Sequence, residues 1–467
     1  MTKKESKAKE LKEKLFMEKK NSGLIMTDAE MKTADKFNEG YKAFLDKGKT
    51  EREAVKAAVE IAEKAGFTEF KLGKKYKAGD KVYCNNRGKA VIFAVFGKES
   101  IEKGVNILAA HIDSPRLDLK QNPLYEDSEL AFFKTHYYGG IKKYQWTTVP
   151  MALHGVINKK DGTVIDVVIG EDDKDPVFVV TDLLIHLAQE QMKKNASTVV
   201  TGEQLNVLIG SRPFKDDEGS ELVKLNIMNI LFEKYGIIEE DFLSAELEVV
   251  PAFKAKDIGF DRSMVGAYGQ DDRVCAYTAL MATVDIKGVP SKTVVTVLTD
   301  KEETGSDGST GLQSSYLEYF IHDIAESLGK NGRHVLSASK CLSADVNAGY
   351  DPNFPEPFEK MNCAYMGKGT CLTKFTGSRG KSGTNDASAE FVGYVRKVFD
   401  DNKVIWQTGE LGKVDFGGGG TVAKYIANLD VDTIDLGVPV LSMHAPFEIT
   451  AKNDVYMTYK AFAAFIK

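Results

Sequence analysis

The chain lacks the features that mark several classes of protein. Its five cysteines are odd in number and include no Cys-x-x-Cys pair, which argues against a disulfide framework or a structural zinc knuckle and is typical of a reducing cytosol. No apolar run approaches the roughly 18 residues needed to cross a bilayer, so no membrane partner is expected. The net charge of -6 implies no domain-scale basic surface, so no nucleic-acid partner is expected either.

The N-terminal region also lacks the apolar core of a secretory signal. Met1 to Lys20 mixes Lys and Glu around Leu11, Leu15 and Phe16, a spacing that predicts an amphipathic helix, with a basic transit-like segment as the alternative. We therefore expect a cytoplasmic protein. The glycine run from Gly417 to Gly420 lacks the Gly-Lys-Ser/Thr ending of a phosphate loop, so no nucleotide site is expected.

What the sequence does contain is an alternation of helical and strand patterns over 467 residues, a length that indicates two or three domains. This alternation predicts an α/β fold whose sheet is mostly parallel, with helices on both faces. The expected helices are Ala29 to Glu63 with a break near Lys47-Gly48, Asp272 to Val284, Ser309 to Leu328, Ala387 to Asp400, Thr421 to Asn428 and Asp454 to Ile466. The expected strands are Ala90 to Phe96, Val105 to Ala110, Thr293 to Thr299, Cys341 to Asp345 and Val438 to Ser442.

The middle of the chain has a different pattern. It carries β-rich pieces at Met151 to Ile157 and Thr163 to Ile169, charged loops, and a predicted helix near Asp182 to Lys194. We interpret residues 119–265 as a β-rich domain inserted into a discontinuous domain of residues 1–118 and 266–467. No Pro/Gly/Ser-rich linker marks the boundaries.

A buried-strand pattern at Val294 to Thr299 stops at Glu302-Glu303-Thr304-Gly305-Ser306. Paired acids in a cleft indicate metal binding, general acid/base work, or one of each. The alternative is a solvated loop, where Glu-Glu pairs are common.

Four other segments share this character. Because strand ends and adjacent loops form the ligand crevice of an α/β sheet, acids and histidines from all five segments can converge there. The other four are His111-Ile112-Asp113-Ser114-Pro115, Gly269-Gln270-Asp271-Asp272-Arg273, Ser343-Ala344-Asp345 and Met443-His444.

These residue types suit two divalent metals. Imidazole and carboxylate are ligands of zinc and its borderline relatives, and a two-metal site needs one bridging carboxylate and a further carboxylate as base. Adjacent glutamates in extended backbone point in different directions, so one can face the metal and the other the attacking water. His111 and Asp113 are two residues apart and share a face, so Asp113 can hold the His111 imidazole in the right tautomer.

In this combination and order the segments resemble the aspartyl aminopeptidases, zinc aminopeptidases that assemble as tetrahedral dodecamers. The family carries His-x-Asp-Ser-Pro, a bridging Asp at a helix start, Glu-Glu-x-Gly-Ser, Ser-Ala-Asp and a late Met-His. The matching residues are His111 to Pro115, Asp271, Glu302 to Ser306, Ser343 to Asp345 and Met443-His444, and the resemblance covers essentially the whole chain.

The resemblance implies a role for each residue. Asp271 would bridge two divalent ions, which are expected to be zinc, although such a set also accepts cobalt or manganese. Glu302 would be the general base that activates a metal-bound water, and Asp113 would orient His111. His111 and Asp345 would complete one metal site, and Glu303 and His444 the other.

The resemblance also implies how the protein assembles and what it cleaves. Residues 119–265 would be the dimerisation domain of a homo-oligomer, with His186 reaching a neighbour's active site; the alternative is a packed helix histidine. Lys374 resembles a family lysine that receives acidic N-terminal side chains, but Arg379-Gly380-Lys381-Ser382-Gly383 departs from the motif that follows it in eukaryotic members. The substrates are expected to be peptides. The alternatives are an aminopeptidase for neutral residues and a non-catalytic oligomeric scaffold.

Overall fold

The β-branched runs of the sequence form the centre of a nine-stranded sheet in the computed structural model, which describes residues 6–216 and 218–467. Its central strands β14, β4, β15 and β21 are parallel, and five of its eight strand pairings are parallel, which confirms the mostly parallel sheet. In spatial order the strands are β1 (Thr68–Glu69), β2 (Lys81–Asn86), β3 (Ala90–Val95), β14 (Val294–Thr299), β4 (Asn106–His111), β15 (Lys340–Ala344), β21 (Asp432–Gly437), β17 (Thr370–Thr373) and β19 (Trp406–Thr408).

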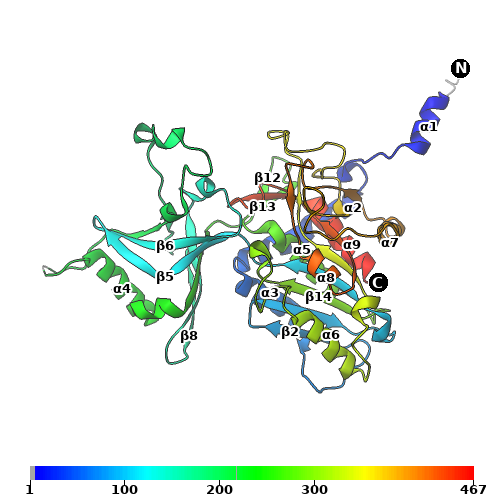
Figure 1. The fold of residues 1–467 in the computed structure, drawn as a ribbon, viewed down its shortest axis with the longest axis horizontal. Coiled ribbons are helices and arrows are strands. Elements are labelled where there is room, and N and C mark those ends of the chain that lie inside the picture. Colours follow the sequence, from blue (N-terminus) through cyan, green and yellow to red (C-terminus); the bar gives the residue numbers. More distant parts are fainter. Residues whose placement is uncertain (1–5, 217) are drawn as a thin grey trace.

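Helices cover both faces of this sheet, as predicted (Figure 1). Along β14, Val294 and Leu298 pack into one apolar core, while Val295 and Val297 pack into a second core on the opposite face. Successive strand residues point to opposite faces, so an apolar run covered on both sides is buried throughout. The first core includes α2 (Asp28–Lys47), α3 (Glu51–Lys64), α5 (Gln270–Val284), α7 (Ala389–Asp401) and α9 (Lys452–Phe465); the second includes α6 (Tyr316–Ser327) and α8 (Ala423–Ala427).

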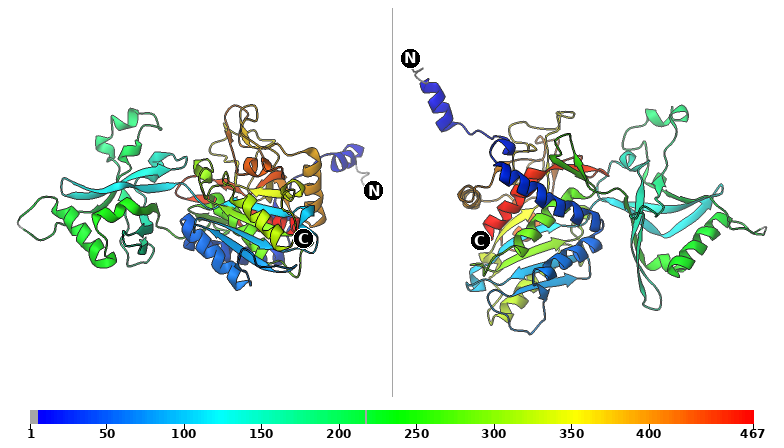
Figure 2. Two further views of the ribbon diagram at one scale, coloured as in Figure 1. Left: turned by 60° about the horizontal axis from the view of Figure 1, so that its bottom comes forward. Right: turned by 180° about the vertical axis from the view of Figure 1, so that it is seen from behind.

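Residues 116–251 form a second lobe around a seven-stranded sheet with its own apolar core (Figures 1 and 2). All its strand pairings are antiparallel. Its elements, in spatial order, are β8 (Val164–Ile169), β7 (Met151–Asn158), β11 (Ala245–Pro251), β5 (Arg116–Asp127), β6 (Leu130–Tyr138), β10 (Val207–Gly210) and β9 (Val179–Val180), with helix α4 (Leu222–Tyr235) packed against the sheet.

Two smaller sheets lie in the first lobe. A five-stranded sheet leads the chain into the region that contains Asp271 and His444, and a two-stranded sheet joins two loops of the same lobe. The five strands are β12 (Lys256–Ile258), β13 (Met264–Ala267), β23 (Glu448–Ala451), β22 (Pro439–Leu441) and β16 (Asn347–Ala348); the pair is β18 (Gly377–Ser378) and β20 (Gly418–Gly419).

The predicted break near Lys47-Gly48 is confirmed, because α2 ends at Lys47 and α3 begins at Glu51. Both helices begin with a capping box, in which Thr27 or Thr50 exchanges hydrogen bonds with a glutamate three residues later. Local sequence chemistry therefore determines where these two helices start.

Two helix predictions are wrong in extent. Asp182 to Lys194 contains only two 3-10 turns, because Leu184 and Ile185 are exposed and short helices need a packed apolar face. The helix expected from Ser309 begins at Tyr316, since Ser and Gly residues before it favour turns.

The N-terminal prediction agrees in part with the structure. Helix α1 (Lys7–Leu15) buries none of its residues and projects away from the lobe (Figure 1), while residues 1–5 lie outside the described part of the chain. In the part of the chain that is described, no helix combines the length and the apolar character needed to span a bilayer.

Candidate metal centre

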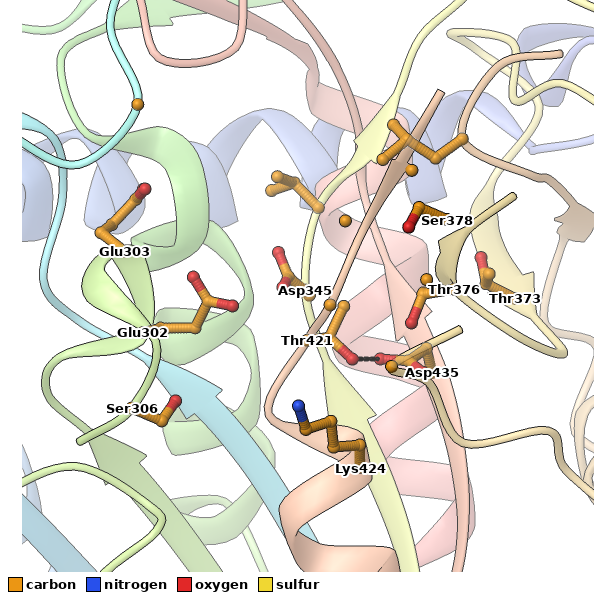
Figure 3. A pocket seen from close by; sticks show the side chains of 18 of the residues that line it. Glu302, Glu303, Ser306, Asp345, Thr373, Thr376, Ser378, Thr421, Lys424 and Asp435 are labelled. Carbon is orange, nitrogen blue, oxygen red and sulfur yellow. Dashed lines mark hydrogen bonds between the residues drawn. The ribbon is translucent and has the colours of Figure 1, made fainter. Parts of the chain in front are cut away.

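Most of the predicted site residues meet at one edge of the nine-stranded sheet, beside a cavity of about 640 Å³ (Figure 3). His111 is the last residue of β4, the two glutamates follow β14, and Asp345 follows β15. Because β4, β14 and β15 are parallel, their carboxyl ends lie together. Asp271 enters the same cavity from the start of α5, and His444 from the loop after β22.

Imidazole and carboxylate groups form two clusters that share Asp271. One cluster is His111, Asp271 and Asp345; the other is Asp271, Glu303 and His444; in each, the potential ligand atoms lie within 4.8 Å of one another. Asp271 Oδ1 is 3.2 Å from His111 Nε2, and Asp271 Oδ2 is 3.0 Å from His444 Nε2. Asp271 thus presents one oxygen to each cluster, the geometry that a bridging ligand requires. Asp272 belongs to neither cluster.

The chemistry of these side chains fits bound cations. Asp271 Oδ1 and Glu303 Oε1 are buried and accept no hydrogen bond from the described residues. Burial raises the pKa of Glu303 well above its usual range, and the negative charge of Asp271 adds to this effect. Burial likewise raises the pKa of Asp345, again with Asp271 adding. Several buried carboxylates with unsatisfied oxygens need positive charge nearby, and two divalent ions would supply it.

Each histidine is held through its second ring nitrogen. His111 Nδ1 lies 3.0 Å from the Asp113 carbonyl oxygen and 3.3 Å from the Asp113 carboxylate. His444 Nδ1 lies 2.7 Å from the carbonyl oxygen of Gly140. Such contacts fix the ring orientation and leave Nε2 of each histidine facing Asp271.

Asp113 also organises the glutamate pair. Its carboxylate accepts the backbone N–H groups of Glu302 and Glu303, both at 3.1 Å, and the hydroxyl of Tyr138 at 2.8 Å. Burial alone would raise the pKa of Asp113, but His111, together with the Tyr138 hydroxyl and the Arg116 charge, outweighs it and the net shift is downward. The ionised carboxylate is therefore the favoured form.

The backbone of the glutamate pair differs from expectation. Glu302 to Thr304 form a 3-10 turn between Lys301 and Gly305, both in the left-handed region, instead of extended chain. The turn is favoured because its amides reach the Asp113 carboxylate. The two side chains still diverge: Glu302 Oε2 is 3.9 Å from His111 Nε2, and Glu303 Oε1 is 3.5 Å from His444 Nε2. Burial, partly opposed by His111, raises the pKa of Glu302 to about 7.

Three residues that belong to no sequence motif also support the two clusters: Tyr138, Gly140 and Glu448. The Glu448 carboxylate accepts the backbone N–H groups of His444, at 2.7 Å, and of Asp271, at 3.1 Å. Its only sequence signal is a position four residues after His444. It thus fixes the backbone beside two potential ligands.

Two predicted site residues lie outside this cluster. His186 sits in an exposed 3-10 turn and makes no hydrogen bond or ion pair with any residue in 6–216 or 218–467. Lys374 forms an ion pair with Asp386, which also binds Lys381 at 2.9 Å, and is not among the residues that line the cavity. By contrast, the glycine run does contribute Gly418 to Gly420 to the lining.

Comparison with known proteins identifies close relatives. The family described as "Aminopeptidase I zinc metalloprotease (M18)" matches residues 44–466. "Probable M18 family aminopeptidase 1" of Clostridium acetobutylicum is 54% identical over 460 residues, which cover 97% of this chain and 99% of the relative.

Solved structures agree with this match. The crystal structure of an M18-family aminopeptidase from Thermotoga maritima has a TM-score of 0.93 at 44% identity and covers 97% of this chain and 99% of that one. The crystal structure of aminopeptidase I from Clostridium acetobutylicum has a TM-score of 0.91 at 50% identity and covers 97% of this chain and 100% of that one. The S. cerevisiae mApe1 dodecamer shares the fold, with a TM-score of 0.74 at 21% identity. The match covers 94% of this chain and 97% of that one.

Proposed function

The chain belongs to the M18 family of zinc aminopeptidases, and we propose that it removes the N-terminal residue of peptides at the two clusters that share Asp271. The observation that carries this proposal is the placement of the two Asp271 oxygens against different histidines. His111 and Asp345 would hold one divalent ion and Glu303 and His444 the other, with Asp271 between them. Zinc is the metal of the family description, and the donor set also suits cobalt or manganese.

Bound ions would supply Lewis acidity, which polarises the scissile carbonyl and makes a nearby water more acidic. Glu302 would take the proton of that attacking water and deliver it to the leaving amine. Its carboxylate lines the cavity and lies near His111, yet it belongs to neither cluster, so it is free to act as the base. Asp113 would orient His111 and fix the turn that carries Glu302.

The experiment that tests this role compares Glu302→Gln with Glu303→Gln. We expect Glu302→Gln to keep its bound metal and lose about 10²–10⁴-fold in kcat on peptides with N-terminal Leu or Asp. Glu303→Gln should lose metal as well as activity, because it removes a ligand charge. Metal content by elemental analysis and peptide hydrolysis give the two readouts.

A Glu390→Gln variant on the exposed surface of α7 serves as the matched control and should behave as wild type. Wild-type activity in metal-loaded Glu302→Gln would rule out Glu302 as the base. Failure of the metal-loaded wild type to cleave any peptide would favour the oligomeric scaffold instead.

We further infer a homo-oligomer in which residues 119–265 are a separate dimerisation domain. Helix α4 is apolar on several sides, yet Val223 is its only described buried residue, and Leu225, Ile230 and Phe232 are exposed. Exposed apolar patches of this kind mark interaction surfaces. Assembly would bring His186 near a neighbouring cavity, and the dodecamer of the mApe1 relative suggests the final number of subunits.

The residue preference and the compartment are also proposals. An acidic preference that depends on Lys374 finds little support, because Asp386 already neutralises that side chain outside the cavity lining. Cleavage of neutral N-terminal residues is therefore the second candidate, and paired assays on Asp and Leu peptides separate the two. The cysteines, which form no disulfide in the described residues, support a reducing cytoplasm.

A further inference from the structure

The wall of the cavity opposite the glutamates is lined mainly by hydroxyl groups and glycines. Hydroxyls donate hydrogen bonds to anionic groups, and glycine backbones leave room for them. The lining also includes the apolar side chains of Val346, Leu411 and Met443, so polar and apolar groups both face the cavity. The hydroxyl residues of the lining are Ser306, Thr373, Thr376, Ser378, Ser382 and Thr421.

Lys424 is the one lysine or arginine among the lining residues of this cavity (Figure 3). Its side chain is half-buried, and no ion pair or hydrogen bond joins its amine to any residue of the described chain. Its Nζ lies over the ring of Tyr425, 4.7 Å from the ring centre. Lys374 and Lys381, by contrast, both bind Asp386.

The backbone of Lys424 is held in place by the helix that carries it, α8. Within α8, Ile426 is fully buried in the core beneath the sheet. The next residue after Lys424, Tyr425, donates its hydroxyl hydrogen bond to the carbonyl oxygen of Gly305 at 3.0 Å. Since Gly305 ends the turn of Glu302 and Glu303, the position of Lys424 is tied directly to the glutamate pair.

Five acidic residues line the cavity: Asp271, Glu302, Glu303 and Asp345 belong to the proposed metal centre, and Asp435 is the one outside it. Asp435 is buried, and its Oδ1 accepts the hydroxyl of Thr421 at 2.8 Å. Among the described residues, no ion pair within 4.0 Å joins Asp435 to Lys424. Burial raises the pKa of Asp435 to about 7, which reduces its negative charge at neutral pH. The amine of Lys424 therefore has no carboxylate partner among the described residues.

We propose that Lys424 is a specificity-determining residue that receives a carboxylate of the peptide substrate. The carboxylate belongs either to an acidic N-terminal side chain or to the C-terminus of a dipeptide, and both present the same chemistry to the amine. This inference rests on the proposed aminopeptidase function. It places the selective cation on α8 and not at Lys374.

The test uses metal-loaded Lys424→Met and Lys424→Arg, with Lys374→Met as the matched control. The substrates are Asp-Ala-Ala, Leu-Ala-Ala, Leu-Ala and the C-terminal amide of Leu-Ala. These form two pairs, Asp-Ala-Ala with Leu-Ala-Ala and Leu-Ala with its amide, and the first member of each pair carries the extra carboxylate. In one of the pairs, we expect Lys424→Met to lower kcat/KM for the first member by about 10- to 100-fold relative to the second, the factor for one lost charge-assisted hydrogen bond. Lys424→Arg should restore most of the loss, and Lys374→Met should leave both ratios unchanged.

The two pairs distinguish the two sources. A change in the Asp/Leu ratio identifies the side-chain carboxylate, and a change in the ratio of Leu-Ala to its amide identifies the C-terminal carboxylate. Unchanged ratios for both pairs overturn the proposal. If wild type cleaves none of the four, the aminopeptidase function fails, and calorimetric binding of L-aspartate then tests Lys424 separately: equal affinity in wild type and Lys424→Met overturns it.

Discussion

Asp113 shows how much of the centre depends on one carboxylate. It contacts the His111 imidazole, the Tyr138 hydroxyl and two amides of the glutamate turn. The sequence predicts the first of these contacts, because His111 and Asp113 lie two residues apart in one motif. The other contacts come from distant segments and follow only from the path of the chain.

Residue charges also predict how the metal-free protein responds to pH. Burial raises the pKa of Asp454 to about 7, even though the backbone N–H groups of Gly367 and Gly369 donate hydrogen bonds to its carboxylate. Burial also raises the pKa of Glu302 to about 7. Their ordinary values are 3.8 and 4.5, so the folded state holds protons that the unfolded chain releases. This stabilisation is complete below about pH 4 and is lost as the pH rises through about 7.

We therefore expect the Tm of the chelated protein to fall by several degrees between about pH 5 and pH 8, as followed by circular dichroism. Asp454→Asn should flatten the slope. Metal loading should reverse the trend, because the ligands bind ions only when deprotonated. A Tm of the chelated protein that rises over this range would contradict the assignment of these buried acids.

Among the elements, the end of β6 is the least expected contributor to the centre. Tyr138 binds Asp113, and the following Gly140 binds His444, so one short segment of the second lobe supports both clusters. Gly139 between them has a φ of +74°, and a Cβ there would lie 3.2 Å from Glu303 Oε2. The second lobe is therefore in direct contact with the proposed ligands.

Tyr138→Phe should weaken metal affinity by about 10-fold while leaving the fold intact, because it removes one hydrogen bond from the carboxylate behind His111. Zinc competition with a chromophoric chelator measures the affinity. Tyr137→Phe, at the adjacent and exposed position, is the matched control and should not change it. Equal affinities for both variants would show that the Tyr138 hydroxyl does not support the centre.

The elements also show what the sequence can and cannot predict. The central strands and the helices that cover them follow from apolar periodicity, and polar residues placed directly after strands predicted the edge where the cluster forms. The segment around His186 has the composition of a helix but no surface in the single chain on which to pack. Tyr138, Gly140 and Glu448 belong to no local pattern, so only the folded chain brings them to the site.

For the whole molecule, the exposed apolar face of α4 predicts assembly through the second lobe. We expect Phe232→Glu to shift the protein toward smaller species in sedimentation velocity, because a buried charge at an interface is unfavourable. If His186 serves a neighbouring cavity, the variant should lose activity while its metal content stays constant. Lys234→Gln, beside it on α4, serves as the charge-matched control, because it also lowers the net charge by one. An unchanged sedimentation profile for Phe232→Glu would place the interface elsewhere.

The order of the ligands along the chain has a consequence for biosynthesis. Synthesis proceeds from the N-terminus, and earlier segments fold first. The cluster of Asp271, Glu303 and His444 needs a residue that is number 444 of 467. A chain interrupted anywhere before that residue has at most one complete cluster. Because the proposed mechanism needs both clusters, we expect peptidase activity to be withheld from every chain that has not yet reached His444.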